Sequence, residues 1–421
     1  MKKMNWLSAL MLGSMIAFTA CSDDEAKGDV FSDLTPEAHK QEIEREGVAL
    51  VKKMEAAKSL ETFDVIDGFF TLMDRTTAQP PVALAMPLTE LQNLSEGNKT
   101  MVSAPAALVA QYRISDEFKS QTGIYEWDEE ATDWRLLAAS DTEATFRFTV
   151  KEQAAEISVY NFSTKDATHQ DEYAETVTEL PLSLNAHVKL GEAVLTSFSL
   201  VAEWNEDDTP RNIVETITLE DFSFTGELVN TNTVVSAGTA FKYNSDVIYA
   251  NGFQLDGNFS YDEIFNTIPQ EGGDMNSVFA QEVLARANAW FQLGNIKIEG
   301  IFDVKGFMDG FVDKAGSLTE NSTEEDFNNM MVELINEYAL FYVRFADSNE
   351  IIAKGEFYLK EVNDYYGGTH VEPAFLMVFG DGSKVSVDDF VKEGFGDLIT
   401  ELEAFTKAMD AAYGGDTTPV Q

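Results

Sequence analysis

The alternation of apolar and polar residues between positions 180 and 260 is the feature that most constrains the fold. Apolar and polar side chains alternate through Leu182–Val188, and the same alternation returns at 198–204. A period of two places the apolar residues on one face of a β-strand. We expect an antiparallel meander here, and its inward-facing side chains are predicted to be Phe198, Leu200, Trp204, Phe222, Phe224, Phe253 and Leu255.

A short pattern repeats inside this stretch. The segment FSFTGEL at 222–228 is followed 31 residues later by FQLDGNF at 253–259. That spacing fits two strands with their turns, which supports the meander.

An aromatic hairpin is predicted upstream, within a β-rich region that we place at 122–260. Two short apolar runs at 124–127 and 134–137 flank the turn-like segment DEEATD. The hairpin carries three aromatic residues that could form a platform for a ligand such as a sugar, namely Tyr125, Trp127 and Trp134. Cross-strand aromatic packing in a core accounts for the same pattern, so both interpretations stay open.

Helical spacing dominates the two ends of the chain. In an N-terminal region at 35–121, Thr35 and Pro36 form a typical helix start, and apolar residues follow at helical spacing through 43–73. A mixed region at 261–413 shows two further helical stripes, at 327–342 and 391–409. Strands are expected between them, at 296–304, 351–362 and 374–379, and a flexible tail at 414–421.

These patterns predict an α+β fold. Its main element is an antiparallel β-meander, which could be curved or form a half-barrel, and long helices pack on it. Three capped and continuous helical stripes favour a solid body over one with an apolar cavity.

The start of the chain has the composition of a signal peptide. Lys2 and Lys3 precede an apolar run at 6–18, and small residues precede Cys21, which is the only cysteine. The segment Phe18-Thr19-Ala20-Cys21 resembles the processing site of bacterial lipoproteins. The resemblance implies removal of residues 1–20 and a lipid on Cys21. A plain signal peptide followed by a free thiol is the alternative.

Four residues after the cysteine carry a second resemblance. Ser22, Asp23, Asp24 and Glu25 are similar to the acidic export signal of Bacteroidota-type surface lipoproteins. This implies a lipid-anchored protein of the outer membrane, exposed at the cell surface. The acids could instead serve only as part of a polar tether, which we place at 21–34.

The charge of the chain excludes one class of partner. The formal net charge is −44, and such a field repels the phosphates of nucleic acids and of anionic lipids. The membrane is therefore expected to be contacted through the lipid on Cys21.

The sequence offers no residues that are distinguished as catalytic. It lacks the nucleophile elbow, the zinc-protease motif and the glycine-rich nucleotide loops. His370 with Glu372 lacks a third metal ligand, and the acidic loop at 204–210 is expected to be solvated. We therefore expect no metal, no cofactor and no catalysis.

The expected function is that of a non-catalytic binding protein of the cell envelope, with an apolar or a glycan ligand. A glycan-processing protein and a structural or adhesive protein are alternatives, and the oligomeric state stays open.

Overall fold

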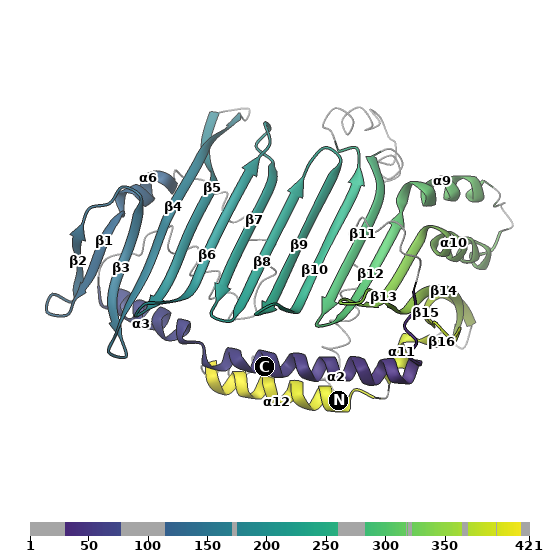
Figure 1. Ribbon diagram of the computed structural model, residues 1–421. Helices are drawn as coiled ribbons and strands as arrows, with labels where there is room; N and C mark the ends of the chain where they lie inside the picture. Colours follow the sequence, from purple (N-terminus) through teal and green to yellow (C-terminus); the bar gives the residue numbers. More distant parts are fainter. Residues whose placement is uncertain are drawn as a thin grey trace. The chain divides into compact units, whose positions relative to one another are not determined.

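The strands of the protein form one open, mixed sheet. The computed structural model describes residues 30–76, 114–170, 175–259, 283–316, 318, 322–363, 369–392 and 394–413. Within them, 16 strands are ordered β16-β15-β14-β13-β12-β11-β10-β9-β8-β7-β6-β5-β4-β3-β1-β2 (Figure 1). The predicted combination of an antiparallel meander with helices is confirmed at this level. The sheet does not close on itself.

The helices lie mainly before and after the strands. They are α2 (Pro36–Met54), the 3₁₀ turn η2 (Glu55–Ser59), α3 (Glu61–Arg75), α6 (Ile114–Ser120), α9 (Val304–Ala315), α10 (Glu324–Tyr338), α11 (Val387–Val391) and α12 (Gly396–Tyr413).

The strands of the first half are β1 (Gly123–Asp128), β2 (Asp133–Ala138), β3 (Glu143–Val150), β4 (Gln153–Gln170), β5 (Glu175–Leu190), β6 (Ala193–Trp204), β7 (Pro210–Leu219) and β8 (Phe222–Asn230). Those of the second half are β9 (Val234–Tyr243), β10 (Asp246–Gly257), β11 (Leu284–Leu293), β12 (Ile296–Asp303), β13 (Ala339–Phe345), β14 (Ile351–Asn363), β15 (Thr369–Phe379) and β16 (Lys384–Ser386). Nearly every neighbour in the sheet is also a neighbour in the chain.

The chain divides into two compact units. Unit 1 comprises residues 1–55, 230–238 and 246–421, and unit 2 comprises 56–229 and 239–245. Each unit has its own core, so each is described by itself.

The core of unit 2 lies between α3 and one face of strands β3 to β7. The apolar alternation of these strands places Phe146, Ile157 and Leu200 on that face, and each is almost fully buried. Helix α3 covers them with Phe69, whose exposed fraction is 0 %. The ring of Phe69 lies 5.6 Å from that of Phe146 and 5.8 Å from that of Phe148. Burial of this apolar surface stabilises the unit.

Five of the seven residues predicted to face inward belong to unit 2. Phe198, Leu200 and Phe222 are buried, and the half-buried Trp204 and Phe224 pack against the same cluster. The other two predicted side chains, Phe253 and Leu255, are half-buried and belong to unit 1.

The core of unit 1 includes an aromatic cluster that is formed in part by β13 and β15. It contains Phe345, Phe379 and Phe390, which are all buried. His39 of α2 is inserted among them, with ring centroids 5.8 Å from Phe345 and 6.1 Å from Phe379. Burial lowers the pKa of His39, because an apolar environment disfavours the charged imidazolium.

The helical stripe predicted at 327–342 ends earlier than its spacing suggests. Helix α10 stops at Tyr338, and Tyr342 lies in β13. The capping box of α10 is formed by Thr323 and Asp326.

The stripe expected at 391–409 is divided between two helices. Residue 391 ends α11, and Gly394 then takes a φ of +104°, which interrupts the helical backbone before α12 begins. Helix α12 packs against α2, where Gly47 leaves room for Leu398: a Cβ at Gly47 would lie 2.7 Å from Leu398 Cδ2. This stripe was expected to pack on the sheet, whereas in the structure α12 packs on α2.

The N-terminal chain is held to unit 1 from residue 30 onward. Phe31 pairs with Ile351 in a parallel bridge, and Ser32 donates to the Ile351 carbonyl. The helix start predicted at Thr35 is confirmed, since its side chain accepts a hydrogen bond from Ala38. Cys21, the proposed export signal Ser22–Glu25 and the tail at 414–421 lie outside the described residues.

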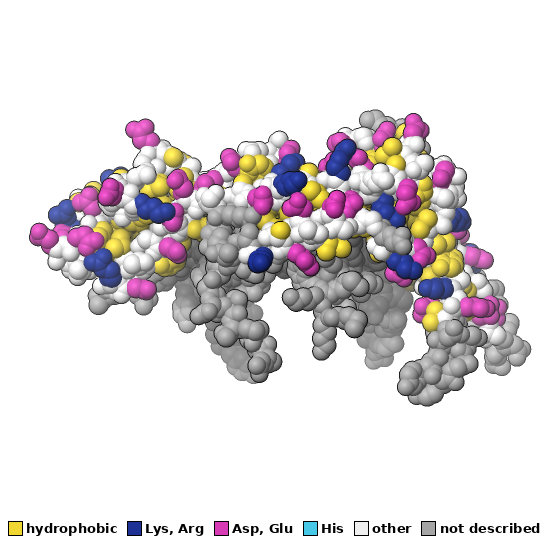
Figure 2. Space-filling view, turned by 90° about the horizontal axis from the view of Figure 1, so that it is seen from below, with side chains coloured by type: hydrophobic (Ala, Val, Ile, Leu, Met, Phe, Trp, Pro, Cys, Tyr) yellow, Lys and Arg dark blue, Asp and Glu magenta, His cyan; other side chains and the backbone are white. Residues whose placement is uncertain are grey.

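The surface carries both signs of charge in mixed order. Figure 2 shows acidic and basic side chains interspersed among apolar ones on the visible face. Among the helices in the described ranges, none is both long and apolar enough to span a bilayer.

Candidate functional site

The three aromatic residues predicted as a ligand platform pack against the core of unit 2. The hairpin β1–β2 forms as expected, and Trp127 lies opposite Trp134. Tyr125 stacks on Phe146 at 5.1 Å with an interplanar angle of 12°, and Trp134 meets the same ring edge-on at 5.0 Å. These contacts favour the core interpretation. A ligand at this hairpin stays a prediction.

The acidic loop at 204–210 uses its side chains internally. Asp207 accepts hydrogen bonds from the backbone and the hydroxyl of Thr209, and these lower its pKa. Asp208 pairs with Lys165 at 2.6 Å. In the described ranges no group of three metal-ligating side chains is found. The side chain of His370 lies outside what the structure describes, and Glu372 is exposed.

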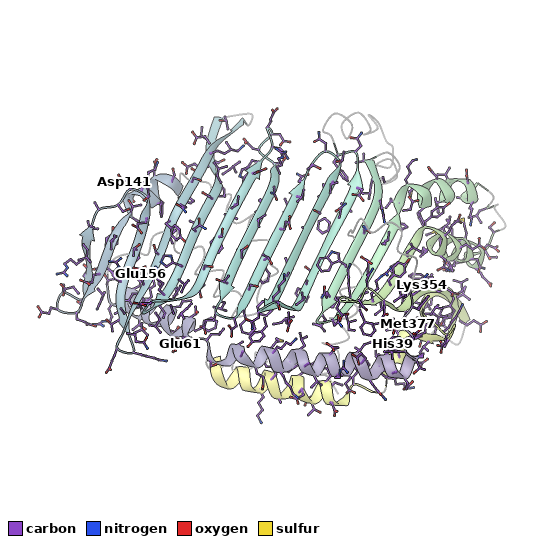
Figure 3. All side chains as sticks on the ribbon, in the orientation of Figure 1. His39, Glu61, Asp141, Glu156, Lys354 and Met377 are labelled. Atoms are coloured by element: carbon purple, nitrogen blue, oxygen red, sulfur yellow. The ribbon has the colours of Figure 1, made fainter. Side chains whose placement is uncertain are left out.

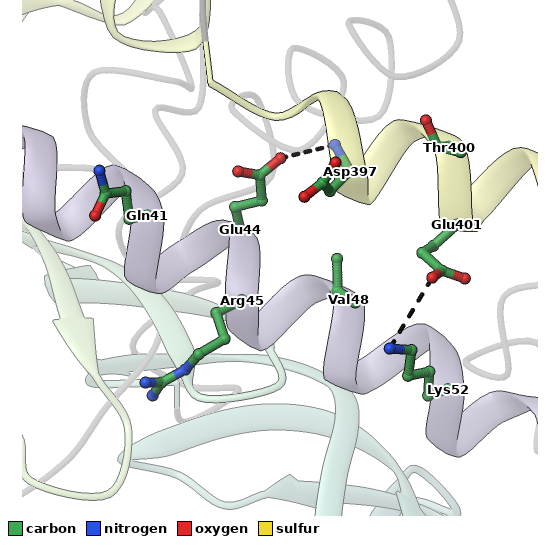
Figure 4. Close-up of a pocket in the computed structure, with 8 residues that line it drawn as sticks. All are labelled: Gln41, Glu44, Arg45, Val48, Lys52, Asp397, Thr400 and Glu401. Carbon is green, nitrogen blue, oxygen red and sulfur yellow. Dashed lines mark hydrogen bonds and ion pairs between the residues drawn. The ribbon is translucent and has the colours of Figure 1, made fainter.

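A groove in unit 1 runs between α2 and α12 and has a volume of about 420 Å³ (Figure 4). Its lining is almost entirely polar: Gln41, Glu44, Arg45, Val48, Lys52, Asp397, Thr400 and Glu401. Glu44 accepts a hydrogen bond from the backbone of Asp397, and Lys52 approaches Glu401 at 4.0 Å. These bonds fasten one helix to the other. A groove with one apolar side chain does not suit an acyl chain.

A charged cluster occupies the polar face of unit 2 around Glu156 of β4 (Figure 3). Its carboxylate accepts hydrogen bonds from Arg147 at 2.9 Å and Lys189 at 3.0 Å, and lies 3.1 Å from His187 Nε2. Burial raises the pKa of Glu156, but the hydrogen bonds outweigh burial and lower the pKa to about 2. His187 is thus half-buried and paired with this carboxylate.

The most unusual polar arrangement crosses the sheet of unit 1. The strand registers place four residues in one line on one face, each directly opposite the next: Trp290, Glu299, Tyr342 and Lys354. We call these four residues the transverse row. Directly opposite residues of neighbouring strands share a face and lie within contact distance. Figure 3 marks Lys354 on β14.

The charge at the centre of the transverse row is buried but compensated. Only 6 % of Glu299 is exposed. Lys297 lies 2.8 Å from one of its carboxylate oxygens, and Arg344 Nε lies 3.5 Å from the other. A buried carboxylate without such partners would be strongly destabilising.

Cations also cover the aromatic rings of the transverse row. The Lys297 ammonium lies 5.7 Å from the centre of the Trp290 ring, and the Arg344 guanidinium lies 4.0 Å from that of Tyr342. Trp290 lies against Gly252, where a Cβ would come within 3.0 Å of the indole. The rings are therefore held in fixed positions, and their faces are already occupied.

Beside the transverse row lies a buried amide. Asn288 is opposite Gln254 on one side and Ile301 on the other, and only 1 % of it is exposed. Neither its Oδ1 nor its Nδ2 has a hydrogen-bond partner in the described structure. An unsatisfied buried polar group costs about 1–3 kcal/mol. Leu340, two strands away opposite Ile301, is 48 % exposed.

Sequence patterns alone do not single out the transverse row or Asn288. The alternation of Ile296, Lys297, Ile298 and Glu299 predicts a strand with a polar face, but which residues meet across strands depends on the register. Asn288 shares its strand with Arg286 and Gln292, so the sequence does not distinguish it.

Comparisons with known proteins give no relative on which to draw. The chain matches no family model, no curated protein and no solved structure.

Proposed function

We propose that the protein is a lipid-anchored, exported binding protein of the cell envelope, and that it is not a catalyst. The observation that carries the binding role is the transverse row with its neighbours Lys297 and Arg344. Its charges are held in mutual ion pairs and its rings are held in place. An arrangement fixed in this way suits the recognition of a ligand more than the movement of protons.

A glycan ligand is better supported than an acyl chain. The groove between α2 and α12 is polar, whereas a site for an acyl chain is expected to be mostly apolar. The face of the sheet that carries the transverse row bears polar groups instead, although Asn288, Glu299 and Tyr342 are themselves buried. This arrangement is compatible with a surface protein that binds glycans.

The anchor rests on the resemblance of Phe18–Cys21 to a lipoprotein processing site. Phe31 is already fastened to unit 1. Phe31 lies ten positions after Cys21 in the sequence, a span of at most about 35 Å. On this proposal the lipid would hold unit 1 close to the membrane.

Replacing the cysteine tests the anchor. We expect Cys21→Ser to move the protein from the membrane fraction to the soluble fraction, because no acyl chain can then be attached. The measurement is fractionation of cells followed by immunodetection. A variant that still sediments with membranes and resists salt extraction would show that the anchor is not the lipid.

The acids after the cysteine are proposed to direct the protein to the cell surface. We expect a variant with alanine at Asp23, Asp24 and Glu25 to stay in the membrane but to lose cleavage by protease added to intact cells. A matched variant with alanine at the more distant Asp29 and Asp33 should stay accessible. If protease cleaves both variants equally, the three acids act only as part of a tether and do not direct export.

A further inference from the structure

We infer that protonation of His39 releases the first half of α2, residues 36–47, from the aromatic cluster of unit 1. The inference goes beyond the binding role proposed above and does not depend on it. It assigns to unit 1 a conformational response to mild acid and names the side chain that triggers it.

Few side chains hold α2 to the strands of unit 1. Within α2, the buried residues are His39, Leu50 and Val51. Leu50 and Val51 lie in the second half of the helix, so the first half is held mainly by His39 and by the partly buried Ile43, which packs against the aromatic cluster. Helix α12 packs on α2 itself and does not replace these contacts. Loss of the His39 contact therefore weakens the first half of α2 selectively.

His39 packs in the aromatic cluster as a neutral ring. Its side chain is 1 % exposed, and its Nδ1 is buried without a hydrogen-bond partner in the described structure. An imidazolium carries a proton on both ring nitrogens. Protonation would therefore leave a buried N–H donor unpaired and place a charge between the rings of Phe345 and Phe379. The faces of those rings offset only part of this cost, and burial accordingly lowers the pKa of His39.

The charged residue next to His39 on α2 also disfavours its protonation. The Lys40 ammonium lies 5.3 Å from the centre of the Phe390 ring, which belongs to the same cluster. A Cβ at Gly394 would lie 2.5 Å from Lys40 Cδ, so the stem of Lys40 is packed in place. Glu37 is exposed and pairs with Lys40 at 3.6 Å. A second cation beside Lys40 is repelled by the first.

The other elements around the cluster supply no buried counter-ion in the described ranges. The cations of β13, β14 and β16, namely Arg344, Lys354 and Lys384, lie on the opposite face of the sheet, which carries the transverse row. The acids of α11, of the turns after β13 and β15 and of the segment before α2 are all exposed: Asp33, Asp347, Glu350, Asp381, Asp388 and Asp389. Water and salt screen exposed carboxylates, so these do not compensate a charge on His39.

Mild acid therefore favours release. In the released segment His39 meets water and regains the ordinary pKa of 6.5, whereas the packed ring takes up a proton only at lower pH. The released state gains protons as the pH falls below 6.5, so its population rises. The buried Leu50 and Val51 and the bridge between Phe31 and Ile351 do not depend on His39, so the opening is local. Release uncovers the apolar rings of the cluster.

The test is hydrogen–deuterium exchange of the full chain, purified in mild detergent and followed by mass spectrometry. Rates at pH 7.5 and pH 5.0 are corrected for the intrinsic pH dependence of exchange. We expect peptides covering 36–47 to exchange about tenfold faster at pH 5.0. The limit is about thirtyfold, because it is set by a released histidine with a pKa of about 6.5. Peptides from β13 and β15 should keep their rates.

Two variants remove the titrating group, and a third serves as the control. His39→Phe should make the exchange of 36–47 the same at both pH values. His39→Leu is smaller and tests the same point if the phenylalanine overpacks the cluster. His187→Gln is the matched control, because His187 pairs with Glu156 in unit 2 and should leave the acid response of 36–47 unchanged.

Three outcomes overturn the inference. The first is an original chain in which 36–47 exchanges equally at both pH values, a result that needs no variant. The second is an acid response that persists in His39→Phe or His39→Leu, since carboxylates rather than His39 would then control the segment. The third is faster exchange of β13 and β15 together with 36–47, which would mean that unit 1 unfolds as a whole.

Discussion

Phe69→Ala is expected to destabilise unit 2 by about 3–5 kcal/mol. The side chain is fully buried, and its ring meets Phe146, Phe148 and Trp134 at centroid distances between 5.6 and 5.8 Å. Removing it loses the burial of the ring and leaves a cavity that close-packed neighbours fill only in part. Urea unfolding followed by tryptophan fluorescence measures the change, because Trp127, Trp134 and Trp204 all belong to this unit.

An exposed leucine provides the control for this experiment. Leu136 on β2 is 53 % exposed, and Leu136→Ala should change stability by no more than about 0.5 kcal/mol. Phe224 is half-buried, so Phe224→Ala should fall between the two variants. If Phe69→Ala were no more costly than Leu136→Ala, α3 would not be the cover of the sheet.

Glu156 is expected to make the stability of unit 2 depend on pH. Hydrogen bonds from His187, Arg147 and Lys189 lower its pKa from 4.5 to about 2, although burial acts in the opposite direction. The folded state therefore holds the proton more weakly than the unfolded state does. The resulting stabilisation is fully present above pH 4.5 and is lost as the pH falls from 4.5 towards 2. It amounts to at most about 3 kcal/mol.

Comparison of two variants isolates this contribution from the other acids. Glu156→Gln should lower stability at pH 6 by about 2–3 kcal/mol, and its difference from the original chain should shrink steadily as the pH falls below 4.5. Asp141→Asn, at an exposed position, should keep a small and constant difference. Urea titrations between pH 3 and 6 provide the data. A Glu156→Gln penalty that is independent of pH would mean that the ion pairs contribute nothing through protonation.

Local patterns predicted the strands well, because each strand has one apolar face. Alternation located β5 and β6, the repeated pattern at 222–228 and 253–259 marked β8 and β10, and the turn residues DEEATD located the hairpin β1–β2. The same reasoning placed β12 at 296–304 and β14 at 351–362, within one residue of their observed bounds at each end. A period of two in the sequence reflects a strand with one buried face, and strands such as β5 and β6 bury one face against a core.

Helix ends were predicted less well, for a physical reason. Tyr338 and Tyr342 are four residues apart, as in a helix, but the chain leaves α10 between them to form β13. Apolar spacing continues across such a boundary because both elements face apolar surroundings. The break before α12 depends on the backbone angle of Gly394, which the sequence allows but does not require.

The candidate site lay beyond the reach of sequence patterns. The transverse row brings together residues from positions 290 to 354, and only the registers of three strand pairs align them. A slip of one residue between β11 and β12 or between β12 and β13 would place Glu299 on the opposite face from Trp290 or Tyr342. The sequence therefore predicts polar faces, whereas tertiary pairing decides which polar groups meet.

The order of the strands has a consequence for how the chain folds. Almost every strand is hydrogen-bonded to the strand that precedes or follows it in the chain, so most pairings close only a short loop. Proteins with such local contacts fold faster than β-proteins whose strands pair across long separations. Within either unit, a hairpin formed anywhere can serve as a template on which the next strand is added, as in repeat proteins. Folding can then proceed from several starting points, and segments can begin to fold as they emerge during synthesis or export.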